Sequence, residues 1–202
     1  MKGWHFLRKD RRLRYDDGRL VRAGRTYRAK GDLVLCKKGM HASRRLIDAL
    51  HWAPGPIVCR VELTGELIHD NDKSVGRSRT VLWILDATLL LHEFACRCDE
   101  DALALTKDPD PRSLEAVRIK RLWLAGKASD EALDAARDAA WAAGDAAWAA
   151  ARIAWDAARI ARIARVAGAA AGAAGAAAMD AARVAQNRRL TAMVAAARQR
   201  GE

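Results

Sequence analysis

The sequence has few of the residues that stabilise secreted or membrane-embedded proteins. Its four cysteines among 202 residues are scattered along the chain, which excludes a disulfide-dense scaffold. The longest stretch without a charged residue, from Val166 to Met179, has 14 residues of mostly alanine and glycine, too short and too weakly apolar to span a bilayer. No apolar signal segment opens the chain, since Met1 to His5 lead directly into a basic stretch. We therefore expect a soluble, cytoplasmic protein with reduced thiols and no membrane partner.

Acidic residues are scarce at the start of the chain. Residues 1–45 hold 15 lysines and arginines against four acids, whereas residues 86–202 hold 17 basic and 16 acidic residues. The formal net charge of +11 therefore comes from the N-terminal segment, and such a field favours an anionic partner. Lys73, Arg77 and Arg79 are expected to extend this basic surface. A solvated basic surface without a ligand is the alternative interpretation.

The composition changes near residue 85, where mixed and β-branched segments give way to long alanine-rich runs. Residues 131–200 contain 33 alanines in 70 positions. The sequence predicts an α+β fold with two domains. Residues 1–85 form a small, basic, mixed α/β domain, and residues 86–202 form an alanine-rich, heptad-patterned helical domain.

Short strands and one helix are expected in the N-terminal domain. Residues 57–63 alternate apolar with other side chains, which indicates a half-buried strand. A helix is expected over residues 44–52, with Ser43 as its N-cap and Pro54-Gly55-Pro56 as its stop. The Asp-Gly pair at Asp17 and Gly18 suits a hairpin turn. The remaining expected strands are residues 4–7, 13–15, 20–21, 26–28, 33–36, 66–69 and 81–85.

Three segments of this domain carry a family resemblance. They are Lys37 to Ser43 (KKGMHAS), Val58 to Gly65, and Asp72 to Val75 (DKSV). Together they resemble a family of phage and bacterial proteins of unknown function, with a glycine-aromatic-histidine strand and an Asp-Lys-Ser-Val element. The resemblance covers roughly residues 1–85 and implies no established chemistry.

His41 is the first candidate for a binding residue, because it lies between a glycine turn and the start of the expected helix. Ser43, Arg44 and Arg45 beside it would form an anion or nucleotide site with the helix-end N–H groups. A hydrogen-bonded structural histidine is the alternative interpretation.

The arrangement around His41 resembles ADP-ribosyltransferases, in which a histidine on an early strand holds the nicotinamide ribose. The resemblance implies an NAD-binding enzyme with a catalytic glutamate. Glu62, Glu66 and Glu93 are the candidates for that acid, but none stands in a recognised motif.

A run of basic residues close to the N-terminus is the second candidate. It consists of Arg8, Lys9, Arg11, Arg12 and Arg14. Such a cluster is typical of a sequence-tolerant, salt-sensitive contact with nucleic acid.

A metal site is not expected. His92 and Cys96 would share one helix face, but Cys98 lies about 200° around the helix from Cys96, and a fourth ligand is missing. No nucleophilic triad, phosphate-binding glycine loop or dinucleotide fingerprint is present. The sequence therefore predicts no catalytic residues and no cofactor.

The helical domain is expected to contain helices over residues 86–106, 113–126, from 129 onward and over 179–198. Trp141, Trp148 and Trp155 recur every seven residues and form one stripe on the third helix. With Arg152 and Arg159 they are the candidate protein interface, although packing inside the protein is an alternative interpretation. Glycines at 168, 172 and 175 weaken the helix, and a turn or kink is expected there.

The segment from about residue 88 to 160 resembles alanine-rich helical proteins grouped with bacterial immunity proteins. From both resemblances we expect a non-enzymatic interaction protein, such as a phage accessory, immunity or counter-defence factor with a protein partner. A nucleotide- or NAD-binding enzyme around His41, and a nucleic-acid-binding protein, are the alternatives. The heptad pattern is compatible with a homo-oligomer through the long helix, and an intramolecular hairpin between residues 130–166 and 177–199 is the alternative.

Overall fold

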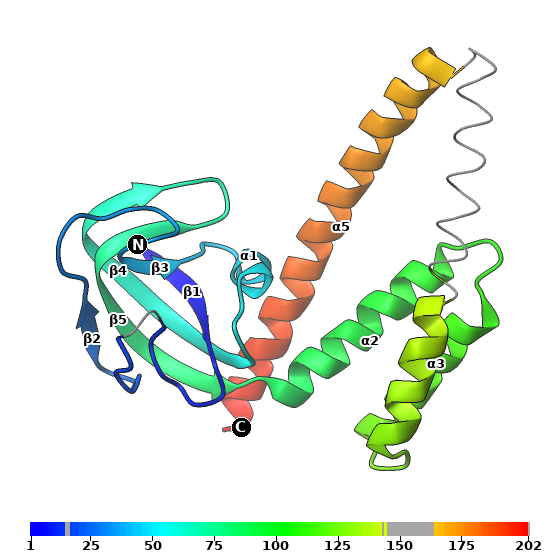
Figure 1. Ribbon diagram of the computed structural model, residues 1–202, viewed down its shortest axis with the longest axis horizontal. Helices are drawn as coiled ribbons and strands as arrows, with labels where there is room; N and C mark the ends of the chain where they lie inside the picture. Colours follow the sequence, from blue (N-terminus) through cyan, green and yellow to red (C-terminus); the bar gives the residue numbers. More distant parts are fainter. Residues whose placement is uncertain (15–16, 143, 145–163, 202) are drawn as a thin grey trace. The chain divides into compact units, whose positions relative to one another are not determined.

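The computed structural model describes residues 1–14, 17–142, 144 and 164–201 (Figure 1). The described elements are strands β1 (Lys2–Leu7), β2 (Thr26–Arg28), β3 (Met40–Ala42), β4 (Ile57–His69) and β5 (Ser74–Asp86), and helices α1 (Leu46–His51), α2 (Thr88–Ala104), α3 (Pro111–Leu124) and α5 (Ala164–Arg200). A further helical segment covers residues 130–142. The expected α+β class is confirmed.

The chain divides into two compact units. The first contains residues 1–91 and 183–202, and the second contains residues 92–182. The expected boundary near residue 85 lies close to the first division. Residues 183–202, which the sequence placed in the helical domain, belong to the first unit.

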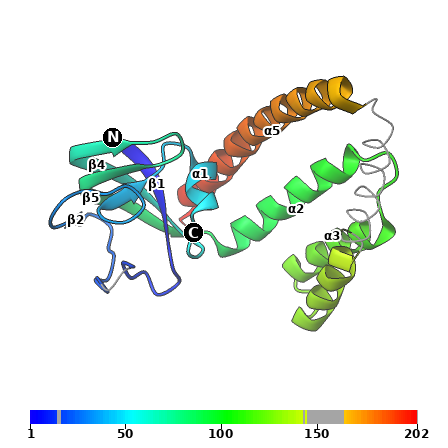
Figure 2. The ribbon, with the colours of Figure 1, turned by 45° about the horizontal axis from the view of Figure 1, so that its top comes forward.

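The sheet of the first unit is antiparallel, with the order β1-β4-β5-β2 and with β3 also paired to β5. It curls back on itself (Figure 2). Trp4 and Ser43 exchange two backbone hydrogen bonds of 2.8 and 2.9 Å, so the chain leaving β3 returns to β1. Gly3 permits this closure, because a Cβ there would lie 2.8 Å from the Ser43 carbonyl oxygen.

A hydrophobic core lies against one face of the sheet. The alternation expected over residues 57–63 is confirmed, since Cys59, Val61 and Leu63 are fully buried in one cluster with Leu7 and Tyr27. This cluster fills the inside of the curled sheet. A shift of one residue in the pairing of β4 would move these apolar side chains to the opposite face of the sheet. Their burial therefore fixes the register of β4.

The last turns of α5 pack onto the first unit. Leu190, Val194 and Ala197 are each at most 2% exposed, and the Arg198 guanidinium lies 4.8 Å from the ring centre of Trp83 on β5. Asn187 Oδ1 accepts a hydrogen bond of 3.1 Å from the Ile47 N–H at the start of α1. This helix therefore supplies part of the core that residues 1–91 need.

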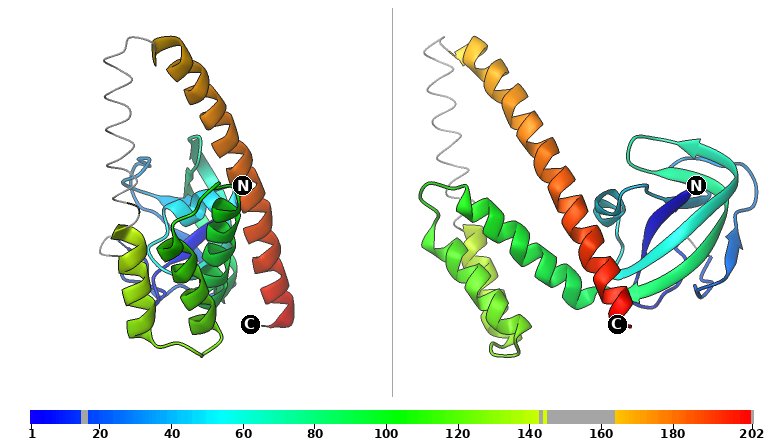
Figure 3. Two further views of the ribbon diagram at one scale, coloured as in Figure 1. Left: turned by 90° about the vertical axis from the view of Figure 1, so that its right-hand side faces the viewer. Right: turned by 180° about the vertical axis from the view of Figure 1, so that it is seen from behind.

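Several sequence expectations are wrong at the level of elements. Where they are described, the expected strands at residues 13–15 and 20–21 are replaced by the isolated bridge between Arg12 and Leu20. α5 runs unbroken through the three glycines (Figure 3), so the expected turn or kink is absent. Each glycine costs about 1 kcal/mol against alanine, but the flanking alanines are the best helix formers. Residues 33–36 form a turn closed by the Val34–Lys38 bridge instead of a strand.

The second unit is helical where it is described. Asp110 caps α3 by accepting from the Arg112 N–H at 2.8 Å, with Pro111 at the first position. Arg121 on α3 forms ion pairs with Glu93 and Glu100 on α2. None of the helices in the described ranges is long and apolar enough to cross a membrane.

Candidate functional site: a basic pocket beside the curled sheet

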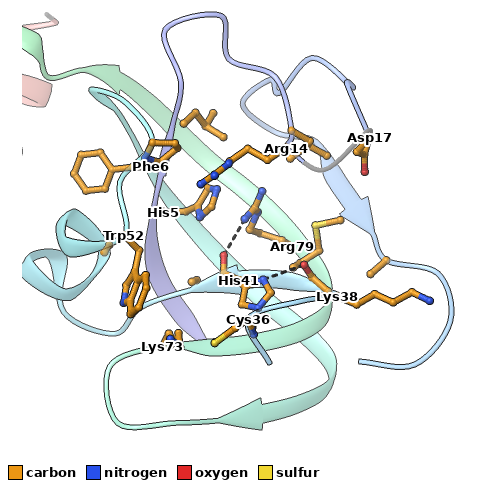
Figure 4. A pocket seen from close by; sticks show the side chains of 18 of the residues that line it. His5, Phe6, Arg14, Asp17, Cys36, Lys38, His41, Trp52, Lys73 and Arg79 are labelled. Carbon is orange, nitrogen blue, oxygen red and sulfur yellow. Dashed lines mark hydrogen bonds between the residues drawn. The ribbon is translucent and has the colours of Figure 1, made fainter. Parts of the chain in front are cut away.

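A pocket of about 750 Å³ opens in the first unit. It is bounded by β1, β3, β5, the C-terminal end of α1, the residues 12–14, 17 and 19, and the segment 28–38 (Figure 4). This volume is in the range of small-molecule sites. The curl of the sheet creates the pocket, since it brings the start of the chain beside β3 and β5.

Arg79 on β5 is the most unusual side chain of the pocket. It is 3% exposed, and its Nη1 donates a hydrogen bond of 2.8 Å to the His41 carbonyl oxygen. Its Nε is buried and has no hydrogen-bond partner in the protein. Within the described residues, no carboxylate forms an ion pair with it. Burial lowers the pKa of Arg79 to about 10, so the guanidinium stays charged at neutral pH.

The expectation that Arg79 belongs to the basic surface is therefore wrong. Its neighbour Arg77 does lie outside the pocket, where it forms an ion pair with Glu66 at 2.5 Å. Alternation along the strand does not separate two residues that are two positions apart, so the difference lies in what surrounds each side chain: Arg79 is buried beside β3, whereas Arg77 lies near the exposed Glu66. The polar run from Ser74 to Thr80 concealed the strand, because its buried positions include serine, glycine and arginine instead of regularly spaced apolar residues.

His41 on β3 is held by two backbone groups. The Cys36 N–H donates to its Nε2 at 3.1 Å, and Nδ1 lies 3.1 Å from the Gly39 carbonyl oxygen. An N–H donor at Nε2 requires that nitrogen to be unprotonated, so the proton is on Nδ1. Burial lowers the pKa of His41, partly opposed by the bond to Gly39. Both ring nitrogens thus serve the loop from Cys36 to Gly39, while the carbonyl oxygen of His41 holds Arg79.

His5 on β1 lines the same pocket and is half-buried. Burial lowers its pKa well below the usual value, and the charge of Arg79 lowers it further. His5 is therefore neutral at pH 7. It adds no charge to the pocket and supplies no negative partner for Arg79.

The charge of the pocket is strongly one-sided. Among the described lining residues there is one carboxylate, Asp17, and it already accepts two hydrogen bonds of 2.5 and 2.6 Å from Arg19. The basic lining residues are Arg12, Arg14, Arg19, Arg28, Lys30, Lys37, Lys38, Lys73 and Arg79. An anion entering the pocket therefore meets a positive field from several sides.

Trp52 provides an aromatic wall. It is the C-cap residue of α1, lines the pocket and is 51% exposed. Its Nε1 donates a hydrogen bond of 2.8 Å to Asp72 Oδ2. The sequence did not indicate this residue as part of a site, because its position beside His41 depends on how α1 packs against the sheet.

The predicted group around His41 is only partly brought together. His41 and Ser43 line the pocket, whereas Arg44 and Arg45 do not. Ser43 is 3% exposed and is not the N-cap, because α1 begins at Leu46 with Arg45 as its N-cap residue. The backbone of Ser43 pairs with Trp4, and this pairing prevents Ser43 from reaching the helix end.

The predicted basic run is divided as well. Arg12 and Arg14 line the pocket, but Arg8, Lys9 and Arg11 do not. Arg8 forms an exposed ion pair with Asp10 at 2.6 Å. The run therefore contributes two members to the pocket, and the nucleic-acid interface stays a prediction.

Of the five residues predicted to form an interface on the long helix, the structure describes only Trp141. Trp141 is 70% exposed on the segment 130–142. Trp148, Trp155, Arg152 and Arg159 lie outside the described residues.

The candidates for a transferase acid do not reach the pocket. Glu62 and Glu66 are on β4 but are not among the lining residues, and Glu93 belongs to the second unit. Across the described ranges, no group of three or more His, Cys, Asp or Glu residues could hold a metal ion. His92 packs edge-on against Trp123, with ring centres 4.8 Å apart.

These features define a basic pocket beside a curled antiparallel sheet. Residues 1–93 match the model of a family described as a domain of unknown function (DUF7666). The expectation of an N-terminal domain from an uncharacterised family is confirmed by this match. No curated protein and no solved structure matches the chain.

Proposed function

We propose that the first unit binds a small phosphate-bearing molecule in the basic pocket. The observation that carries this proposal is the buried guanidinium of Arg79, whose Nε has no partner in the protein. A buried charge without a counter-ion costs several kcal/mol. A phosphate group would supply both the negative charge and the missing hydrogen-bond acceptor.

The remaining basic side chains support the same ligand class. Lys73 and Arg14 approach from the turn before β5 and from the chain after β1, while Asp17 is neutralised by Arg19. A ligand with two or more negative charges gains more from this field than a neutral molecule does. The absence of other carboxylates among the described lining residues keeps repulsion of such a ligand low.

Binding is better supported than ADP-ribosyl transfer. None of the three candidate glutamates lines the pocket, and both ring nitrogens of His41 are already hydrogen-bonded to the backbone. The transferase alternative therefore lacks its acid within the described pocket. The protein-interaction role, the phage or immunity context, the cytoplasmic location and the homo-oligomer stay predictions.

Calorimetric titration of the full chain with inorganic phosphate, pyrophosphate and ribose 5-phosphate tests the proposal. We expect saturable binding that weakens as salt is raised, because surface charges are screened. Arg79→Met should abolish binding, since it removes the buried charge and fills a similar volume. Arg77→Met is the matched control, because it removes an arginine two positions away that faces outside the pocket.

Arg79→Lys separates a binding role from a purely structural one if Arg79→Met does not fold. It keeps the charge but loses the planar fork that suits phosphate, so we expect a folded protein with clearly weaker binding. Absence of binding by the wild type to all three compounds, or equal binding by the Arg79 and Arg77 variants, would overturn the proposal.

A further inference from the structure

Trp52 has features that the phosphate proposal does not use. A tryptophan that is 51% exposed leaves much of a large apolar ring in water, which is unfavourable unless something covers it. It lies at the wall of the same pocket as Arg79, at the end of α1 (Figure 4). The ring is therefore placed where a bound molecule would meet it.

The orientation of this indole is fixed by three neighbours. Asp72 accepts the hydrogen bond from Nε1 at 2.8 Å, and the His51 ring packs edge-on with centres 4.8 Å apart. The Lys73 ammonium lies over the ring, 3.7 Å from its centre. A ring held in this way loses little conformational freedom on binding, and this favours its use as a preformed platform.

Lys73 links the platform to the charged part of the pocket. It also hydrogen-bonds the Cys36 thiol, and this bond raises the pKa of Lys73. Cys36 is in turn tied through its N–H to His41, whose carbonyl oxygen binds Arg79. Contacts thus run without interruption from the aromatic ring to the buried guanidinium.

We propose that the pocket takes a nucleotide, with its base stacked on Trp52 and its phosphate at Arg79. This inference rests on the proposed function and specifies the chemical class of the ligand. A nucleobase offers a planar π-face of the size of an indole, and stacking tolerates any base because every base has such a face. A pocket of about 750 Å³ is of the size that holds one small ligand.

Comparison of ribose 5-phosphate with AMP and UMP on the full chain tests the inference, because these compounds share the sugar phosphate and differ in the base. We expect both nucleotides to bind more tightly than ribose 5-phosphate, by between roughly fivefold and 150-fold, the range of base–aromatic stacking. Trp52→Leu should remove that difference and leave the affinity for ribose 5-phosphate unchanged. Trp52→Phe should restore most of it.

Trp141→Leu is the matched control, because Trp141 is an exposed tryptophan in the other unit. Equal affinities of wild type for AMP, UMP and ribose 5-phosphate would overturn the nucleotide inference while the phosphate proposal stands. A nucleotide preference that survives in Trp52→Leu would overturn the role of Trp52. Failure of all phosphate compounds to bind would instead refute the proposed function itself.

Discussion

Asp48 connects α1 to Arg183 near the middle of α5, and its removal should weaken the first unit specifically. Asp48 is 2% exposed. Its two oxygens accept hydrogen bonds of 2.6 and 2.9 Å from Arg45 and one of 2.9 Å from Arg183. Burial alone would raise the pKa of Asp48, but the two arginines outweigh burial and lower it. The carboxylate is therefore ionised at neutral pH.

The size of the effect follows from what each partner loses. Breaking a fully buried ion pair costs about 3–5 kcal/mol, but the side chains of Arg45 and Arg183 are 46% and 39% exposed and can turn to water. We therefore expect Asp48→Ala to cost about 2–3 kcal/mol. Arg183→Ala leaves the bonds to Arg45 intact and should cost about 1 kcal/mol.

Native-state hydrogen exchange of the β4 amides measures the opening free energy of this unit in the full chain. The exposed pair of Arg8 with Asp10 provides the control, and Asp10→Ala should leave β4 exchange unchanged. Because the folded pKa of Asp48 is lowered, its contribution is complete above about pH 4 and is lost as pH falls below that value. A loss below about 0.5 kcal/mol in Asp48→Ala would refute the reasoning that this carboxylate anchors α5.

Three further outcomes are expected. Burial lowers the pKa of His5, so as pH falls the unfolded state takes up the histidine proton before the folded state does, and the melting temperature should fall below about pH 6.5. In thermal scans at several pH values, His5→Gln should make the melting temperature less dependent on pH. An unchanged pH dependence in this variant would contradict the prediction. Leu190→Ala, at a residue with 0% exposure, should cost about 2–5 kcal/mol in β4 exchange, whereas Val184→Ala at 43% exposure should cost little. Burial raises the pKa of Cys59 to about 12, whereas Cys36 is exposed. At pH 8 a thiol reagent should therefore modify Cys36 at once and Cys59 only after the protein unfolds. Rapid labelling of Cys59 in the folded protein would contradict its place in the core.

Local patterns were enough for the elements whose signals lie within a few residues. The alternation over residues 57–63 predicted β4, and the Pro54-Gly55-Pro56 stop agrees with the end of α1 at His51. The helices expected over residues 86–106 and 113–126 correspond to α2 and α3, although the Asp110 cap and Pro111 start α3 two residues earlier than expected. These signals work because hydrophobic period, proline geometry and helix capping act along the chain itself.

The same patterns failed where a distant partner decides the conformation. No strand was expected over residues 74–80, yet they form the first half of β5, flanked by β4 on one side and by β2 and β3 on the other. β3 has three residues and holds its place through Gly76, Val75 and Ser74 on β5. A strand so short has little preference of its own, since its hydrogen bonds go to another part of the chain.

The sequence by itself determined the class of fold, the uncharacterised family of the N-terminal part and the excess of positive charge at its start. Only the tertiary structure decided which basic side chain is buried. Arg77 and Arg79 are two arginines in the same polar run of the sequence. In the structure Arg79 is buried inside the curled sheet, whereas Arg77 pairs with the exposed Glu66. The closure between Trp4 and Ser43 holds β1 and β3 beside the part of β5 that carries Arg79, whereas Arg77 lies beyond the lining of the pocket. Burial and pairing depend on contacts between residues far apart in the chain, and no local pattern records them.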